Sequence, residues 1–288
     1  MADSSGKVVL ITGATDGLGK AAAILLAEKG YRVYGAGRSA EKRAQLDELA
    51  QAKKLPLKSL EMDVCSDDSV RAAVQQVLAE AGQIDVLINN AGLGYMAVVE
   101  ELKMEDMRQQ FETNVFGVLR VTQAVLPAMR ARKSGRILMI SSVAGLVSPP
   151  TYGAYSSSKH ALEGLSNALR LELYPFNIQV VLIEPGYIRT GFQQAATELA
   201  KPYVEAAKGS PYAQVYSGAW GAANSSRSAS KTTPEDCARV MLHAMETASP
   251  HPRYGVTPIA TLVKFGKRFL PDKWLDTFLR KKYGIGRA

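Results

Sequence analysis

Short apolar runs alternate with amphipathic stretches through the first two thirds of the chain. The apolar runs cover 7–12, 31–37, 57–62, 84–88, 136–142 and 178–183 and have the length of buried strands. Between them, apolar residues recur at helical spacing over 21–27, 67–80 and 104–131, and again from 155 onward. This alternation predicts a single doubly wound, Rossmann-like α/β domain with a mostly parallel sheet.

The first apolar run is followed at once by a glycine-rich loop. Gly13, Gly17 and Gly19 stand between this run and an apolar helix. Glycines allow the backbone to turn tightly and to approach a pyrophosphate, and a helix N-terminus supplies N–H donors and a positive dipole end. Such a loop can also be an ordinary turn. The strand before it and the helix after it favour a dinucleotide site.

The end of the second run indicates which dinucleotide is bound. A fold that binds NAD places Asp or Glu near this point to hold the ribose hydroxyls. Here Gly37 takes that position and Arg38 follows it, and a guanidinium is suited to a 2′-phosphate. The sequence therefore favours NADP(H).

Tyr155 and Lys159 are one turn apart on the same face of a predicted helix. An ammonium about 5 Å from a phenol, at an effective dielectric of about 20, lowers the phenol pKa by ~2 units and makes it a general acid/base. Such a pair also occurs on many solvated helices. Ser142, at the end of the preceding strand, is a turn residue or a donor to a substrate carbonyl. Tyr152 is a second phenol, but Ser156 rather than Lys stands one turn beyond it.

Four motifs stand in order along the chain. They are Thr12-Gly-x-x-x-Gly17-x-Gly19, Asn89-Asn-Ala-Gly92, Ser142 and Tyr155-x-x-x-Lys159. Together, over about Lys7 to Thr190, they resemble the signature of the short-chain dehydrogenase/reductase family. Within it, the chain is similar to members acting on steroids, retinoids or acyl-chain ketones.

This resemblance implies a catalytic set and a set of cofactor contacts. The catalytic set is Ser142, Tyr155, Lys159 and Asn114. Asn is a poor helix former, and in the family the residue matching Asn114 distorts the helix and holds a water linked to the lysine; a merely tolerated Asn is the alternative. The cofactor contacts are Gly13, Thr15, Gly17, Leu18, Gly19, Arg38, Asp63, Val64, Asn90, Ala91, Gly92, Tyr155, Lys159, Pro185, Gly186, Ile188 and Thr190.

Two of these assignments have specific counter-arguments. Asp63, matched to the adenine contact of the family, can instead be an ordinary loop carboxylate. Asp16 stands in the glycine loop, where NADP-using relatives often carry a basic residue, and is a contrary sign for NADP.

The resemblance implies hydride transfer between NADP(H) and a carbonyl or secondary alcohol on a hydrophobic small-molecule substrate. Tyr155 would exchange the proton, Ser142 would hold the oxygen, Lys159 would bind the ribose and Asn114 would support a proton relay. The alternative is a nucleotide-sensing protein on the same fold without turnover. Such proteins tend to lose the catalytic Tyr or Lys, and both are present here.

Composition narrows the range of partners. The net charge is +8, but 251–288 holds nine Lys and Arg against two Asp, so +7 of it lies there and nucleic acid is not an expected partner. Cys65 and Cys237 are far apart in the sequence and suggest reduced thiols in a reducing compartment. With three histidines and no Cys/His cluster, we expect no metal site. The chain shows neither a signal-like start nor an apolar span of ~20 residues, so we expect a cytoplasmic protein.

We expect a catalytic domain over 1–250, with a substrate lid at 190–232, and a basic amphipathic helical extension over 251–288. Four aromatic residues within the lid segment, Tyr203, Tyr212, Tyr216 and Trp220, suggest a large apolar substrate; the alternative is a poorly ordered surface insertion. The extension either makes peripheral membrane contact or packs on the protein's own core. The family resemblance further suggests a homodimer or homotetramer, paired through 104–131 and 155–174.

Overall fold

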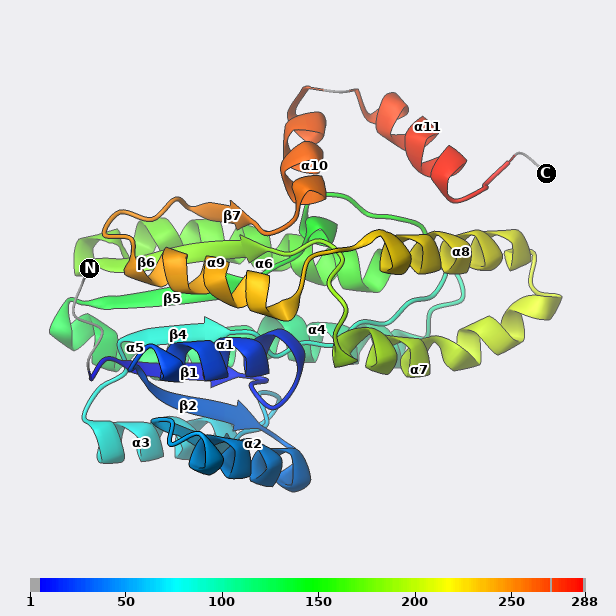
Figure 1. Ribbon diagram of the computed structural model, residues 1–288. Helices are drawn as coiled ribbons and strands as arrows, with labels where there is room; N and C mark the ends of the chain where they lie inside the picture. The colour runs from blue at the N-terminus through cyan, green and yellow to red at the C-terminus, as the bar shows by residue number, and fades with distance from the viewer. Residues whose placement is uncertain (1–5, 270, 287–288) are drawn as a thin grey trace.

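A seven-stranded parallel sheet forms the centre of the protein in the computed structural model, which describes residues 6–269 and 271–286 (Figure 1). The side chains at 226–229, 265 and 268 lie outside this description. The strand order is β3-β2-β1-β4-β5-β6-β7. The strands are β1 (Val8–Thr12), β2 (Arg32–Gly37), β3 (Leu57–Glu61), β4 (Val86–Asn89), β5 (Gly135–Ile140), β6 (Ile178–Glu184) and β7 (Arg253–Gly255). The order reverses direction between β1 and β4, where such sheets bind ligands at their carboxyl edge.

Helices cover both faces of the sheet. One face carries α1 (Gly17–Glu28), α2 (Ala40–Ala52) and α9 (Pro234–Glu246), and the other carries α3 (Asp67–Ala81), α5 (Gly117–Arg132) and α6 (Gly153–Glu172). The helix α4 (Met104–Phe111) leads into α5. At the carboxyl edge lie α7 (Gly191–Ala206) and α8 (Ala213–Ala229), and beyond β7 follow α10 (Pro258–Phe269) and α11 (Asp272–Lys282) (Figure 1). The predicted doubly wound parallel fold is confirmed.

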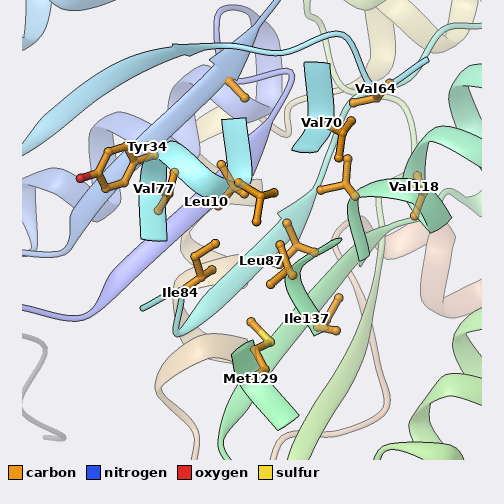
Figure 2. Packing of buried hydrophobic residues seen from close by; sticks show 14 of the residues in the cluster. Leu10, Tyr34, Val64, Val70, Val77, Ile84, Leu87, Val118, Met129 and Ile137 are labelled. Carbon is orange, nitrogen blue, oxygen red and sulfur yellow. The ribbon is translucent and has the colours of Figure 1, made fainter. Parts of the chain in front are cut away.

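Apolar side chains from the strands and from one helical layer form a continuous core. Leu87 of β4 and Ile137 of β5 lie in one cluster with Val77 of α3 and Met129 of α5 (Figure 2). All four side chains are fully buried. A second cluster joins the opposite sheet face to α1, α2 and α9. The two clusters fix the sheet between its helical layers and thereby fix the positions of the loops at its carboxyl edge.

The long helix expected over 104–131 is interrupted. Between α4 and α5 the chain makes one wide turn, a π-helix over Glu112–Phe116, and Asn114 lies in its middle with a fully buried side chain. Turns of this kind occur frequently at functional sites. The distortion expected at Asn114 is therefore present.

The segment over 192–231 is helical rather than loosely structured. It forms most of α7 and all of α8, joined by a short 3-10 turn over Ala207–Gly209. The interpretation as a poorly ordered insertion is wrong, because apolar positions such as Tyr203 and Tyr216 are buried against a neighbouring loop. Glycine and alanine in α8 are small contact residues on a helix.

The last two helices leave the body of the protein and return to it at their end (Figure 1). Tyr283 is buried against Ala219 and Ala222 of α8, so the end of the extension is anchored there. Most of the apolar face of the extension does not pack on the core, since Leu262, Phe269, Trp274 and Phe278 are between 58% and 70% exposed. The alternative that the extension packs on the protein's own core therefore holds for Tyr283 at its end, but not for most of its apolar side chains.

Candidate active site

The ends of β1 and β4 are tied together beside the glycine-rich loop. Thr12 Oγ1 accepts hydrogen bonds from the backbone N–H groups of Asn90 (3.0 Å) and Ala91 (2.9 Å). The Asn90 side-chain amide in turn donates to the carbonyl oxygens of Thr12 (2.9 Å) and Gly13 (3.0 Å). Asn90 and Ala91 thus lie against the loop. The sequence does not predict that the Thr12 side chain joins the two strand ends. Its place at the last position of the first strand is the signal that could have indicated this role.

The glycine-rich loop has the shape of a phosphate cradle. Gly13 and Gly17 have positive φ angles of 64° and 52°, which favour glycine. A Cβ atom at Gly19 would lie 2.4 Å from both Asn90 Nδ2 and the Gly13 carbonyl oxygen, so no side chain fits there. The loop leads directly into the N-terminus of α1, whose N–H groups and dipole attract anions. These residues fit the pyrophosphate of a dinucleotide.

Basic side chains gather beyond the end of β2. Arg38 is exposed, and among the described residues none forms an ion pair with its guanidinium. Lys42 Nζ lies 2.6 Å from Asp16 Oδ2. Although partial burial opposes it, the hydrogen bond and charge of Lys42 lower the pKa of Asp16. The carboxylate in the glycine loop is therefore offset by a lysine, and the end of β2 has a net positive character.

Asp63 and Val64 follow β3 and are engaged within the protein. Asp63 Oδ1 accepts a hydrogen bond from the backbone of Cys65 (3.0 Å), as an ordinary loop carboxylate does. The Val64 side chain is buried in the core, and its carbonyl accepts a hydrogen bond from Arg120 (2.7 Å). Their contact with adenine stays a prediction.

Ser142 and Tyr155 meet at the carboxyl end of β5. The Ser142 hydroxyl accepts a hydrogen bond from the backbone of Ala144 (3.1 Å) and donates one to the Pro185 carbonyl oxygen (3.5 Å). The Tyr155 ring packs against Phe192, with ring centroids 5.6 Å apart. Burial raises the pKa of Tyr155 to about 12, and the neighbouring Ser142 hydroxyl only partly opposes this.

Lys159 lies beside Tyr155 without lowering its pKa. The Lys159 Nζ atom is 5.7 Å from the centroid of the Tyr155 ring and donates a hydrogen bond to the Ile140 carbonyl oxygen (2.8 Å). Burial lowers the pKa of Lys159 to about 8, and the charge of Glu163 opposes this. The lowered Tyr155 pKa expected from the sequence is therefore wrong. Desolvation of the phenol dominates, and the ammonium lies over the ring and faces a carbonyl group.

Asn114 holds the chain that follows β4. Its side-chain oxygen accepts from the Leu93 N–H (2.9 Å), and its amide nitrogen donates to the Leu93 carbonyl (2.9 Å) and to Ser158 Oγ (3.1 Å). A Cβ atom at Gly92 would lie 3.3 Å from Asn114 Oδ1 and 3.9 Å from Lys159 Nζ. Gly92 thus lies between Asn114 and Lys159, and the fold brings all members of the predicted catalytic set to one region.

The segment after β6 faces the glycine-rich loop. A Cβ atom at Gly17 would lie 3.1 Å from Thr190 Cβ. The Thr190 hydroxyl donates to Gln193 Oε1 (2.9 Å), which orients it at the start of α7. The Pro185 carbonyl accepts from the backbone of Val143 (2.9 Å) and ties this segment to the residue after Ser142. The Ile188 side chain is buried in the core.

A small, mostly apolar hollow of about 20 Å³ lies between α7, α8 and the loop before α6. Its lining includes Met96, Tyr152, Ala200, Val204 and Trp220. Because the Tyr152 and Tyr155 ring centroids are 6.4 Å apart, the hollow adjoins the predicted catalytic tyrosine.

The tyrosines of the lid segment mainly make structural hydrogen bonds. The hydroxyl groups of Tyr203, Tyr212 and Tyr216 hydrogen-bond Asp106, Glu100 and Glu101 respectively. They hold α7 and α8 against the segment over 98–106. Among these three, Tyr216 also lines the hollow. Of the four aromatic residues that suggested a large apolar substrate, Tyr216 and Trp220 line the hollow.

Comparison with known proteins gives one consistent result. A sequence model described as short chain dehydrogenase matches residues 7–200. A 3-ketodihydrosphingosine reductase of Bacteroides thetaiotaomicron is 43% identical over 186 residues, which cover 65% of this chain and 65% of the reductase. The uncharacterized oxidoreductase YbbO of Escherichia coli strain K12 is 35% identical over 278 residues, or 95% of this chain and 94% of YbbO.

Solved structures agree with the sequence comparison. A short chain dehydrogenase/reductase from Burkholderia phymatum, in complex with NAD, is 26% identical and has a TM-score of 0.82, covering 96% of this chain and 97% of that chain. The likeness extends over the whole sheet and its helical layers. The chain therefore belongs to the short-chain dehydrogenase/reductase family of oxidoreductases, which use a nicotinamide cofactor to act on CH–OH groups of small molecules.

Proposed function

We propose that the protein is an NADP(H)-dependent oxidoreductase that interconverts a carbonyl and a secondary alcohol on a hydrophobic substrate. The observation that carries this proposal is the meeting of Ser142, Tyr155 and Lys159 beside the glycine-rich loop. The cofactor supplies the hydride, and the protein supplies orientation and proton transfer.

Tyr155 is the proton donor in the direction of carbonyl reduction. A phenol with a pKa of about 12 is protonated at neutral pH, so it can hydrogen-bond a carbonyl oxygen and give it a proton as negative charge develops. Ser142 donates to the same oxygen and stabilises that charge. Lys159 binds the nicotinamide ribose, and Asn114 supports the proton relay. In the oxidative direction the phenol must first lose its proton, so the raised pKa favours reduction.

The preference for NADP(H) rests on Arg38. Its exposed guanidinium follows Gly37 at the end of β2, and Lys42 offsets the charge of Asp16 nearby. Gly37 stands where NAD-binding folds carry Asp or Glu, so no carboxylate at this position repels a 2′-phosphate. Arginine binds phosphate oxygens in a bidentate manner.

The substrate class rests on the hollow beside Tyr155. Its lining from Met96, Val204 and Trp220 is apolar, which supports a hydrophobic substrate. The Bacteroides relative is named a 3-ketodihydrosphingosine reductase, which supports an acyl-chain ketone.

The proposal is tested by titrating the protein with NADPH and NADH, using tryptophan fluorescence, and by following consumption of each with a panel of apolar ketones and aldehydes. We expect tighter binding of NADPH than of NADH and turnover with long-chain ketones. Binding without turnover on any member of the panel would favour the nucleotide-sensing alternative.

We also propose that the extension over 251–288 contacts anionic membrane surfaces. Exposed Phe269, Trp274 and Phe278 lie among lysine and arginine residues, and apolar side chains next to cationic ones suit a lipid headgroup region. In the part of the chain that the structure describes, no helix is both long and apolar enough to cross a bilayer.

Changing both Trp274 and Phe278 to serine is expected to reduce binding to vesicles of phosphatidylserine and phosphatidylcholine at least about tenfold. The change removes two aromatic side chains that would insert into the lipid headgroup region. Val99→Ser is the matched control, since Val99 in the loop before α4 is 69% exposed, as Trp274 is. Vesicle co-sedimentation measures the effect. Equal binding by the double variant and the wild type would refute membrane contact through α11.

A homodimer or homotetramer remains our proposal for the assembly. Phe116 in the π-helical turn and Leu171 on α6 are 50% and 70% exposed, and both lie on the elements expected to pair. Sedimentation equilibrium will measure the mass.

A further inference from the structure

One turn beyond Lys159 on α6, Glu163 belongs to a buried ionic cluster that the proposed proton transfer does not use. Arg253 of β7 lies between two carboxylates: its NH2 atom is 2.9 Å from Glu163 Oε2, and its Nε atom is 3.2 Å from Glu184 Oε1. The side chains of Glu163, Glu184 and Arg253 are 9%, 0% and 24% exposed. The cluster joins α6, the end of β6 and β7.

Lys159 is a further buried cation whose charge interacts with this cluster. Two carboxylates share one guanidinium, which leaves one carboxylate without a full counterion. Lys159 is 5% exposed, and its ammonium donates to a neutral carbonyl group, that of Ile140. A buried charge is costly unless an opposite charge compensates it. Lys159 therefore adds a second buried cation to Arg253, while the exposed Lys264 acts on Glu184 from outside the cluster.

Glu163 is the carboxylate placed to compensate Lys159. Residues four apart on a helix lie on the same face, one turn apart. Arg253 binds Glu163 through Oε2, and among the described residues Oε1 has no hydrogen-bond partner. The charge of Glu163 also acts on Lys159 against the effect of burial.

We propose that Glu163 is a positioning residue, held by Arg253, that serves as the buried counterion of Lys159 and keeps the lysine charged for cofactor binding and proton transfer. Glu163 touches neither cofactor nor substrate in this role and acts through Lys159. The inference rests on the proposed function for its catalytic consequence. The charge state of Lys159 can be measured independently.

Other charged groups around the cluster set the conditions of the test. Glu184 comes from β6, Arg253 from β7 and Lys264 from α10, and the charge of Lys264 acts on Glu184. Tyr155 lies on the same helix as Lys159 and is protonated at neutral pH. The 3-10 turn packed against α6, Val143–Gly145, carries no titratable side chain. In this environment, Glu163 is the carboxylate whose removal will change the Lys159 titration most.

The experiment is an NMR titration of protein carrying lysine labelled with ¹³C at Cε, with the Lys159 signal assigned by its loss in Lys159→Met. In the wild type we expect Lys159 to titrate near pH 8, well below the other lysines. Glu163→Gln is expected to lower this midpoint by about one pH unit or more, because an anion one turn away is removed. Arg253→Gln is expected to move it upward, because a cation is removed.

Two further variants separate charge from structural disturbance. Glu163→Asp keeps the carboxylate and is expected to restore most of the midpoint. Asn167→Ala removes a hydrogen-bond acceptor of Arg253 (3.0 Å) without a change of charge and is expected to leave the midpoint within about 0.3 pH units. An unchanged midpoint in Glu163→Gln, or a downward shift in both Glu163→Gln and Arg253→Gln, would overturn the inference. The titration needs no turnover, so failure of the proposed enzymatic function would be detected separately in the ketone assay.

Discussion

Replacing Tyr155 with phenylalanine is expected to reduce kcat by about 10²–10⁴-fold, the range that general acid–base catalysis contributes. The change removes one hydroxyl group and keeps the ring that packs against Phe192 at a centroid distance of 5.6 Å. The glycine-rich loop and the basic residues after β2 are untouched. The dissociation constant of NADPH should therefore stay within about threefold of the wild-type value. Steady-state kinetics and fluorescence titration measure the two quantities.

Tyr152→Phe is the matched control for this prediction. Tyr152 is the neighbouring phenol, with a ring centroid 6.4 Å from that of Tyr155, and it lines the apolar hollow. Its replacement can change KM but should keep most of kcat. Loss of NADPH binding in Tyr155→Phe would show that Tyr155 is structural. An equal loss of kcat in both variants would mean that the proton donor has been misassigned.

The sheet could be predicted from the sequence because its strands are buried on both faces. Val8–Thr12 of β1 and Val86–Asn89 of β4 are buried at every position, and such strands are uniform apolar runs that stand out from the helices between them. Elements with a weaker apolar signal were missed. The amphipathic α2 buries only Leu46 and Ala50, and β7 has three residues, none of them buried.

The sequence predicts the grouping of Ser142, Tyr155 and Lys159 better than it predicts their pKa values. Local motifs place Tyr155 and Lys159 on one helix, but the pKa of each depends on burial by segments distant in the sequence. For Tyr155 that burial outweighs the nearby ammonium, which reverses the direction expected from spacing alone. Arg253 and Glu163 are 90 positions apart, and their ion pair exists because β7 adds to the sheet beside β6. No sequence pattern links the two residues.

The proposed preference for NADP(H) rests on the guanidinium of Arg38, and its removal is expected to have the second largest effect. Arg38→Ala should weaken NADPH binding by about 10- to 100-fold, because hydrogen bonds to a charged group contribute about 1.5–3 kcal/mol. NADH lacks the 2′-phosphate, so its dissociation constant should change by less than about threefold. Titration of both dinucleotides at one fixed salt concentration measures the difference, since salt screens the interaction of exposed charges.

Arg32→Ala is the matched control for Arg38, because Arg32 is also an exposed arginine of this chain but stands at the opposite end of β2. Its guanidinium lies 5.4 Å from the centroid of the Tyr34 ring, far along the strand from the glycine-rich loop. Its removal lowers the net charge of the protein by the same amount, so equal losses of NADPH affinity in both variants would indicate a general charge effect. If the wild type binds NADH as tightly as NADPH, the Arg38 guanidinium does not bind the 2′-phosphate. Loss of NADPH binding in Arg38→Ala alone, with NADH unaffected, requires a contact between Arg38 and the group that distinguishes the two cofactors.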